Sequence, residues 1–342
     1  MPDVNETIFD AEVRHQVYLG RFSAGVARRI IALLNRTNDD LVKRLRELDT
    51  EWTLARVDAL LDAVREMNRG AYEELAAMLG REVESFAGYE AEFQARTIDR
   101  SLPVRLDVVT PAREQVYAAA MARPFQGRLL REWMAGLEAG AAQRVRDAVR
   151  IGFVEGETVD QIVRRVRGTR ARQYEDGILQ ISRRDAATIV RTAINHTANV
   201  ARNATYEANG DLIKGIRWVS TLDGRTSAVC RARDGEVYPV DKGPRPPAHH
   251  NCRSTTAPVT KSWRELGFDI DDLPPATRAS MNGQVPGDQT YDGWLRRQSN
   301  EFQADVLGVE KAKLFRDGMK LDRFVDRAGR ELTLDELRRL EA

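Results

Sequence analysis

The segments DGRTSAVCRARDG (residues 223–235) and PPAHHNCRST (residues 246–255) decide how the whole sequence is interpreted, because they hold its scarcest residues. The chain has 342 residues but only two cysteines and four histidines. Both cysteines and two of the histidines lie in these two segments. Thiol and imidazole groups gathered among prolines and glycines predict a small loop-rich module that is closed by a metal or by packed thiols.

Cys230, His249 and Cys252 offer the soft and borderline donors that zinc takes in a closed site with four ligands. Asp223 and His250 are the candidates for a fourth ligand. A short module with few large apolar residues often needs such a staple. The alternatives are buried thiols beside histidines that bond loop carbonyls, or a disulfide formed in air. The sequence therefore leaves the cofactor open between none and zinc.

A catalytic role for this cluster has weaker support. A cysteine nucleophile needs a neighbouring base, and Cys252 lies close to His249 in sequence. No helix N-terminus or orienting Asn or Asp can be assigned to that pair from the sequence. The metalloprotease, nucleophile-elbow and zinc-deaminase motifs are absent from the sequence. We therefore predict that the protein is not an enzyme and has no catalytic residues.

The composition is that of a folded protein with long solvated helices. Hydrophobic residues make up 42% of the chain and charged residues 31%, and the net charge is +1. This balance excludes general disorder and a molecule that binds nucleic acid through its overall charge. No apolar run approaches the roughly 18 residues that span a bilayer, and the first residues have no apolar signal core. We expect synthesis in the cytoplasm, no membrane partner, and reduced cysteines.

Apolar residues spaced by three and four predict two or three long amphipathic helices within residues 1–100. One stripe runs from Leu19 to Leu48, and a second runs from Val57 to Phe86. Such stripes form the core of a helical bundle, or an arm that contacts a partner. The sequence leaves both alternatives open.

Capping signals predict further helices. These span residues 111–122, 125–150, 156–168 and 182–210. Thr158 is the expected N-cap of the third, with Gly168 as its stop, and Ser182 with Asp185 resembles a capping box for the fourth. A T-x-x-E box at residues 333–336 predicts a final helix.

After residue 210 the pattern becomes one of short strands and loops. Residues 213–221 and 235–240 have strand character, and a turn with a short helix joins them. The predicted fold class is mainly α with a small α+β module: an elongated helical N-terminal region, then a compact, loop-rich, β-containing domain. The predicted domains are residues 1–100, an attachment region of long helices; 101–180, helical with a basic stretch; 181–260, the module; and 261–342, an α+β extension.

The basic stretch lies within residues 164–184. Its arginines are Arg164, Arg165, Arg167, Arg170, Arg172, Arg183 and Arg184. Contact with DNA phosphates is one use for such a stretch. A solvated helical face and salt bridges to a partner are the alternatives.

The segments RTAINHTAN, IRWVSTLDGRTSAVCRARDGEVY and PPAHHNCRS resemble the signature of the phage Mu F-like minor head proteins, the phage head-morphogenesis family. The matching residues are Arg191, Thr192, Trp218, Asp223, Arg225, Thr226, Cys230, Asp234, Gly235, Pro246, Pro247, His249, Cys252 and Arg253. The resemblance is strong over residues 186–258 and 279–340. Relatives that look ready for zinc carry a C-x-x-C and a C-R-C pair, whereas this chain has Ser227 and Ser254 in place of one cysteine of each pair.

The resemblance implies a minor capsid protein of a tailed bacteriophage, located in the virion, inside the head near the portal vertex. Its expected partners are the portal protein, the scaffold or major capsid protein, and packaged DNA. The expected roles are procapsid assembly, DNA packaging and ejection. The alternatives are a head-carried enzyme or DNA-processing effector of the nuclease or toxin kind, and a zinc-stapled DNA-binding protein.

Two local contacts are also expected to hold the module together. Asp223 is predicted to accept hydrogen bonds from backbone amides of its own turn. Arg253 is predicted to pair with Asp234.

Overall fold

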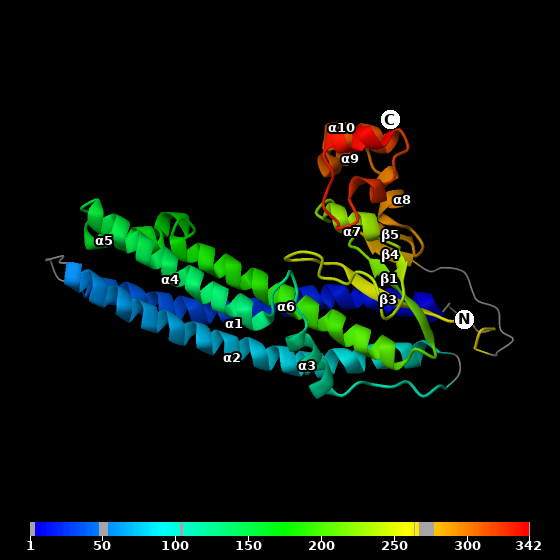
Figure 1. Ribbon diagram of the computed structural model, residues 1–342, viewed down its shortest axis with the longest axis horizontal. Coiled ribbons are helices and arrows are strands. Elements are labelled where there is room, and N and C mark those ends of the chain that lie inside the picture. The colour runs from blue at the N-terminus through cyan, green and yellow to red at the C-terminus, as the bar shows by residue number, and fades with distance from the viewer. Residues whose placement is uncertain (1–3, 48–53, 103–104, 263, 267–276, 342) are drawn as a thin grey trace. The chain divides into compact units, whose positions relative to one another are not determined.

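The computed structural model describes residues 4–47, 54–102, 105–262, 264–266 and 277–341 (Figure 1). The chain divides into two compact units. The module unit contains residues 1–20, 87–120 and 195–342, and the helical unit contains residues 21–86 and 121–194. The four domains predicted along the sequence stay a prediction. The predicted fold class, mainly α with a small β-containing module, is confirmed.

Most of the chain is helical up to residue 208. The helices are α1 (Val4–Arg46), α2 (Leu54–Ser101), α3 (Arg113–Ala122), α4 (Leu130–Val154), α5 (Val159–Arg167), the 3₁₀ turn η1 (Arg170–Arg172) and α6 (Ile178–Ala208). The predicted apolar stripes are buried: Leu19, Val26 and Ile30 on α1 and Leu75, Leu79 and Val83 on α2 are at most 3% exposed. These members of both stripes therefore lie in the protein core, and Leu48, the predicted end of the first stripe, lies outside the described residues. No helix of the described chain is long and apolar enough to cross a membrane.

The core of the helical unit lies where α4 and α5 meet the ends of two longer helices. Its buried members include Leu45, Val57, Leu61, Val149, Ile162, Val166 and Leu179. The predicted start of α5 is confirmed, since Thr158 Oγ1 accepts from Gln161 N and Gln161 returns a bond to Thr158 N. Gly168 ends the helix as predicted.

Two predicted helix starts are wrong. α4 begins at Leu130 rather than at residue 125, because Phe125 and Arg128 bond each other across a tight turn. α6 begins at Ile178, so Ser182 lies inside the helix and caps nothing. Its hydroxyl instead accepts a hydrogen bond of 3.1 Å from Arg144 on α4.

The module unit is built around a small antiparallel sheet. β1 (Ile213–Val219) lies between β2 (Val237–Tyr238) and β3 (Thr255–Thr260). Along the β1–β3 pair, Trp218 lies opposite Thr256 and Val219 opposite Thr255. The short helix α7 (Ala228–Arg233) follows β1, as the sequence predicts.

The C-terminal segment packs on this sheet region. Its elements are β4 (Thr277–Ser280), β5 (Gly283–Pro286), α8 (Tyr291–Arg296), α9 (Asn300–Leu307), α10 (Val309–Arg316), the 3₁₀ turn η2 (Leu321–Phe324) and α11 (Leu334–Glu341). Leu222, just after β1, is buried in the same core as Trp294 and Phe315. The capping box of the final helix is confirmed by reciprocal bonds between Thr333 and Glu336.

Candidate metal centre

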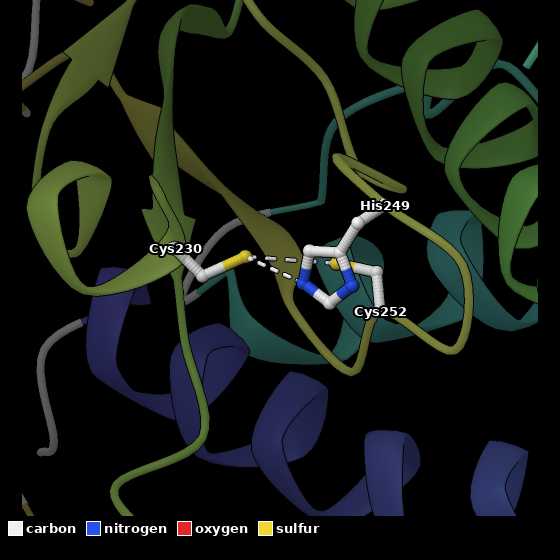
Figure 2. A group of neighbouring side chains, drawn as sticks. All are labelled: Cys230, His249 and Cys252. Atoms are coloured by element: carbon white, nitrogen blue, oxygen red, sulfur yellow. Dashed lines mark hydrogen bonds between the residues drawn. The ribbon is translucent and has the colours of Figure 1, made fainter. Parts of the chain in front are cut away.

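The three predicted donors meet at one point in the module. Cys230 is the third residue of α7, and His249 and Cys252 lie on the loop between β2 and β3. The two sulfurs are 3.7 Å apart, and the Cys230 sulfur is 3.5 Å from His249 Nε2 (Figure 2). All three donor atoms lie within 4.8 Å of one another. The structure therefore gathers the residues that the sequence marked.

These distances fit the edges of a zinc tetrahedron. With Zn–S near 2.3 Å and Zn–N near 2.05 Å, tetrahedral angles place two sulfurs about 3.8 Å apart and a sulfur about 3.6 Å from a nitrogen. The distances of 3.7 Å and 3.5 Å differ from these by about 0.1 Å. A disulfide needs sulfurs near 2.05 Å. Both cysteines are free thiols. The separation of their sulfurs, and that of the Cys230 sulfur from His249 Nε2, match those of metal ligands and not those of a disulfide.

The imidazole of His249 is oriented as a ligand. Its Nδ1 lies 2.8 Å from the carbonyl oxygen of His250. A carbonyl only accepts, so Nδ1 carries the proton and Nε2 presents its lone pair to the sulfurs in the neutral ring. This arrangement, in which the second ring nitrogen donates to a carbonyl, is typical of metal-bound histidines.

The two thiols are electrostatically unequal. The hydrogen bond with Cys252, together with burial, raises the pKa of Cys230, while the same bond and His249 lower the pKa of Cys252. The bond with Cys252 also raises the pKa of His249. Cys252 is therefore the thiol that ionises more easily, and its thiolate favours the protonated form of His249. Metal binds thiolate and neutral imidazole, so metal binding at this cluster would release protons.

Neighbouring side chains fix the loop that carries two of the donors. Asn195 on α6 donates to the Cys252 carbonyl over 2.6 Å. Arg245 donates to the carbonyls of Pro239 and Val240, each over 2.8 Å, and to Asn203 on α6. The loop is therefore held by side chains as well as by its own turns. No local pattern predicted the roles of Asn195 and Arg245, although Asn195 belongs to the segment RTAINHTAN.

The fourth ligand proposed from the sequence is not at the cluster. Both Asp223 oxygens accept from Arg253, over 2.6 and 2.8 Å. The group of close metal donors found in the described residues contains neither Asp223 nor His250. The predicted turn is confirmed, since Arg225 N donates to Asp223.

The predicted pair of Arg253 with Asp234 is wrong. Asp234 is bound by Arg278 of β4, which donates to both of its oxygens over 2.9 and 3.0 Å. Asp234 also accepts from the backbone amides of Ser220 and Tyr291. The Asp234 carboxylate accepts from four donors and is fully satisfied. Arg253 pairs instead with Asp223, which precedes α7 in the chain.

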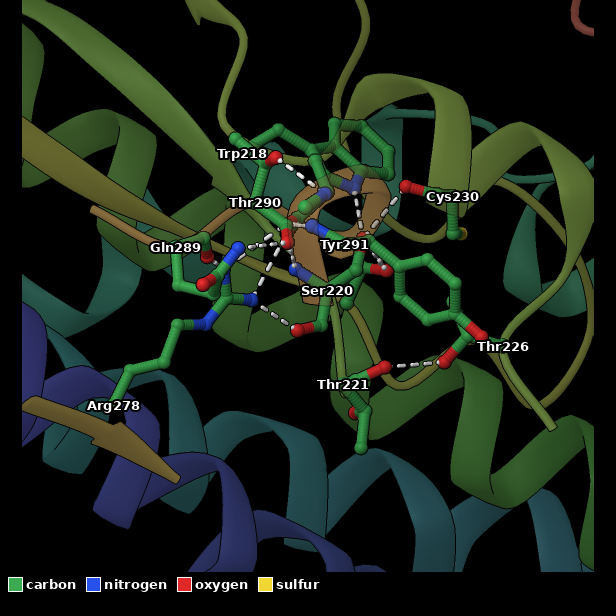
Figure 3. A network of polar contacts seen from close by, with 12 residues as sticks. Trp218, Ser220, Thr221, Thr226, Cys230, Arg278, Gln289, Thr290 and Tyr291 are labelled. Atoms are coloured by element: carbon green, nitrogen blue, oxygen red, sulfur yellow. Dashed lines mark hydrogen bonds and ion pairs between the residues drawn. The ribbon is translucent and has the colours of Figure 1, made fainter. Parts of the chain in front are cut away.

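A polar network extends from this ion pair to the cluster (Figure 3). The Trp218 indole donates to Ser220 Oγ, and Ser220 Oγ donates to the Cys230 carbonyl over 2.8 Å. Arg278 donates to the carbonyl oxygens of Ser220 and Gln289. β1, α7 and the C-terminal segment are thus joined beside the thiols. Arg278 had no signal in the sequence, because its partner is 44 positions away.

The remaining signature residues also serve the architecture. Thr226 Oγ1 donates to the Thr221 carbonyl, and Thr192 Oγ1 to that of Thr188. Gly235 has a φ of +86°, and a Cβ there would lie 2.9 Å from the Thr290 methyl carbon. Pro246 and Pro247 are buried in the loop, whereas Arg191 is exposed on α6.

The basic stretch lies in the helical unit, and part of it is paired internally. Arg165 binds Glu155 and Glu157, Arg167 binds Asp39, and Arg183 binds Asn35 and the Tyr174 carbonyl. Four arginines have exposed side chains: Arg164, Arg170, Arg172 and Arg184. Only part of the stretch is therefore open to an external phosphate.

Comparison with known families supports the resemblance seen in the signature. Residues 143–257 match the family described as phage Mu protein F like protein. The matched range contains the metal-donor cluster and all of the signature residues. No curated protein and no solved structure matches the chain.

Proposed function

We propose that this phage Mu F-like chain is a minor head protein of a tailed bacteriophage that attaches to the portal vertex inside the head. Its proposed roles are procapsid assembly, DNA packaging and ejection. The observation that carries the proposal is the family match over residues 143–257, which indicates a head-morphogenesis protein. We further propose that its partners are the portal protein and the scaffold or major capsid protein.

The geometry of the module favours an architectural role over catalysis. Cys230 and Cys252 are 1% and 5% exposed, so neither sulfur is accessible to a polypeptide or nucleic-acid substrate. They pack with the buried Trp218 and the partly buried Val229, Tyr238 and Ala248. Asn195 and Ser220 bond the backbone carbonyls of the two cysteines and leave the sulfurs to each other and His249. We propose that the protein is not an enzyme.

A zinc ion is the proposed staple of the module. Cys230, Cys252 and His249 would hold it, and its chemistry there is the joining of α7 to the β2–β3 loop. The support is the agreement of the donor distances with tetrahedral edges and the fixed Nδ1 of His249. Metal analysis of the purified full chain tests this directly, and about one zinc per chain is expected.

Attachment is proposed to use the N-terminal helices. Val17 on α1 is 56% exposed, and Tyr89 on α2 is 39% exposed. The test is co-purification of the full chain with the portal protein encoded by the same phage. Val17→Glu is expected to weaken that binding at least about fivefold, since a buried charge costs free energy at an interface. The matched control is Val309→Glu on α10, where the side chain is 61% exposed.

Two results would overturn the assignment. One is the absence of the chain from purified virions by mass spectrometry. The other is metal-dependent cleavage of DNA by the purified chain, which would favour the head-carried nuclease instead. Unchanged portal binding by Val17→Glu would overturn only the proposed attachment surface.

A further inference from the structure

The donor cluster supplies only three close protein ligands among the described residues, whereas a closed zinc site uses four. Two serines occupy the sequence positions at which relatives with C-x-x-C and C-R-C pairs carry a cysteine. Ser227 comes three residues before Cys230, and Ser254 comes two residues after Cys252. Both serines are close enough to the Cys230 thiol to oppose, in part, the rise of its pKa that Cys252 and burial cause.

Ser227 is not used as a helix cap. It is the N-cap residue of α7, but its side chain makes no cap hydrogen bond. Its Oγ is buried and has no hydrogen-bond partner within the described part of the chain. By contrast, Ser299, the N-cap of α9, accepts from Phe302 N in the usual way. A buried hydroxyl without a hydrogen-bond partner destabilises the fold unless a bound water or ligand supplies that hydrogen bond.

The Ser254 hydroxyl, unlike that of Ser227, already has a hydrogen-bond partner. Its Oγ lies 3.3 Å from Ser220 Oγ, and Ser220 in turn bonds the Cys230 carbonyl. Ser254 is therefore part of the polar network, whereas the buried Ser227 hydroxyl has no hydrogen-bond partner among the described residues. A neutral serine hydroxyl is a poor zinc ligand compared with a thiolate or an imidazole.

We infer that Ser227 and Ser254 leave the metal with three protein ligands and one exchangeable position, which a monodentate ligand from outside the chain fills. The class of that ligand is water or another small donor such as imidazole. Ser227 provides the hydrogen-bonding partner for it. This inference rests on the proposed zinc staple. It makes the fourth coordination position of the metal exchangeable, whereas a closed site would fill it with a protein ligand.

The experiment uses the full chain loaded with Co²⁺, whose absorption reports the ligand set. Added imidazole is expected to change the spectrum of the wild-type site, because it enters the exchangeable position. Ser227→Cys is expected to abolish that response. It is also expected to tighten Co²⁺ and Zn²⁺ binding at least about tenfold in chelator competition, and to raise thiolate-to-cobalt absorption roughly by half, as two thiolates become three. Ser299→Cys is the matched control, with a cysteine added at another N-cap.

The outcomes separate the two proposals. If the wild-type chain binds no Co²⁺ or Zn²⁺, both the staple and the inference are wrong. If it binds metal but imidazole leaves its spectrum unchanged, the staple stands and the exchangeable position is refuted, whether or not the variant folds. If Ser227→Cys binds no more tightly than Ser299→Cys, the role given to Ser227 is wrong.

Discussion

Arg278 donates to both carboxylate oxygens of Asp234, and their side chains are 3% and 0% exposed. Asp234 belongs to the signature module and ends α7, whereas Arg278 belongs to β4. The same guanidinium bonds the carbonyl oxygens of Ser220 and Gln289. The C-terminal segment is therefore anchored in the polar core beside the two thiols.

Removing this anchor is expected to destabilise the module. Arg278→Ala leaves the buried Asp234 carboxylate without its counter-charge, at a cost of about 3–5 kcal/mol in the free energy of unfolding. Denaturant unfolding of the full chain, followed by circular dichroism, measures the loss. Arg323→Ala, which removes an exposed arginine of the same segment, is expected to cost less than about 0.5 kcal/mol. Equal losses in the two variants would contradict the anchoring role.

The Asp223–Arg253 pair predicts a pH dependence. Burial raises the pKa of Asp223, but Arg253 outweighs it and holds that pKa below its ordinary value of 3.8. A folded pKa below the unfolded one contributes stability above about pH 4, and this contribution is lost as the pH falls through the folded value. We expect Asp223→Asn to be roughly 1 kcal/mol less stable at pH 7 and to lose less stability on acidification.

Asp241→Asn is the control for that measurement, because Asp241 lies on the β2–β3 loop, which also carries Arg253, and is 70% exposed. It is expected to follow the wild-type curve of unfolding free energy against pH. If Asp223→Asn also follows the wild-type curve between about pH 5 and pH 2, the pair does not stabilise the module.

Local signals predicted some features and failed for others with the same spacing. Thr158 is the N-cap that the sequence predicts, and the structure adds a reciprocal bond with Gln161 that completes a capping box. Ser182 and Asp185 have the same spacing, but Arg144 of α4 bonds both of them, and the helix runs through. A tertiary partner decided the second case, and no periodicity in the sequence reveals it.

The candidate site shows the same division. Rarity of cysteine and histidine was enough to predict that Cys230, His249 and Cys252 belong together. The partner of Arg253 was predicted wrongly, because Asp223 and Asp234 flank α7 and are chemically equivalent in the sequence. Arg278 occupies Asp234 in the folded chain, and Arg253 therefore pairs with Asp223.

A second buried ion network, in the module unit, predicts another large loss of stability. Arg202 on α6 binds Glu12 on α1 over 3.0 Å and Glu90 on α2 over 3.1 Å, and all three side chains are fully buried. Arg202→Ala strands two carboxylates and is expected to cost about 3–5 kcal/mol of unfolding free energy. Adding Glu12→Gln and Glu90→Gln to that variant is expected to recover part of the loss, because the stranded charges are removed.

The control for this network is Arg14→Ala, which removes an arginine from α1, the helix that carries Glu12. Arg14 is 78% exposed and pairs with Asp10. Its expected cost is below about 1 kcal/mol. Thermal or denaturant unfolding distinguishes the variants. No recovery in the triple variant would show that lost packing of the Arg202 stem, rather than stranded charge, dominates.

The DNA contact proposed for the basic stretch now rests on four arginines, since Arg165, Arg167 and Arg183 are engaged within the chain. The quadruple glutamine variant changes Arg164, Arg170, Arg172 and Arg184. Each guanidinium that neutralises a phosphate releases about one counterion, so the slope of log affinity against log salt is expected to become shallower by up to about four. Binding of duplex DNA to the full chain, measured over a range of salt concentrations, gives that slope.

A matched variant removes the same number of positive charges from elsewhere on the surface. Its substitutions are Arg14→Gln, Arg65→Gln, Arg69→Gln and Arg96→Gln, at residues that pair with neighbours on their own helices. Because net charge changes equally in the two variants, a larger change of slope in the first assigns phosphate contact to residues 164–184. An identical slope in both would assign any DNA affinity to net charge alone. A wild-type chain that binds no DNA at low salt would refute the contact, because phosphate attraction is strongest under that condition.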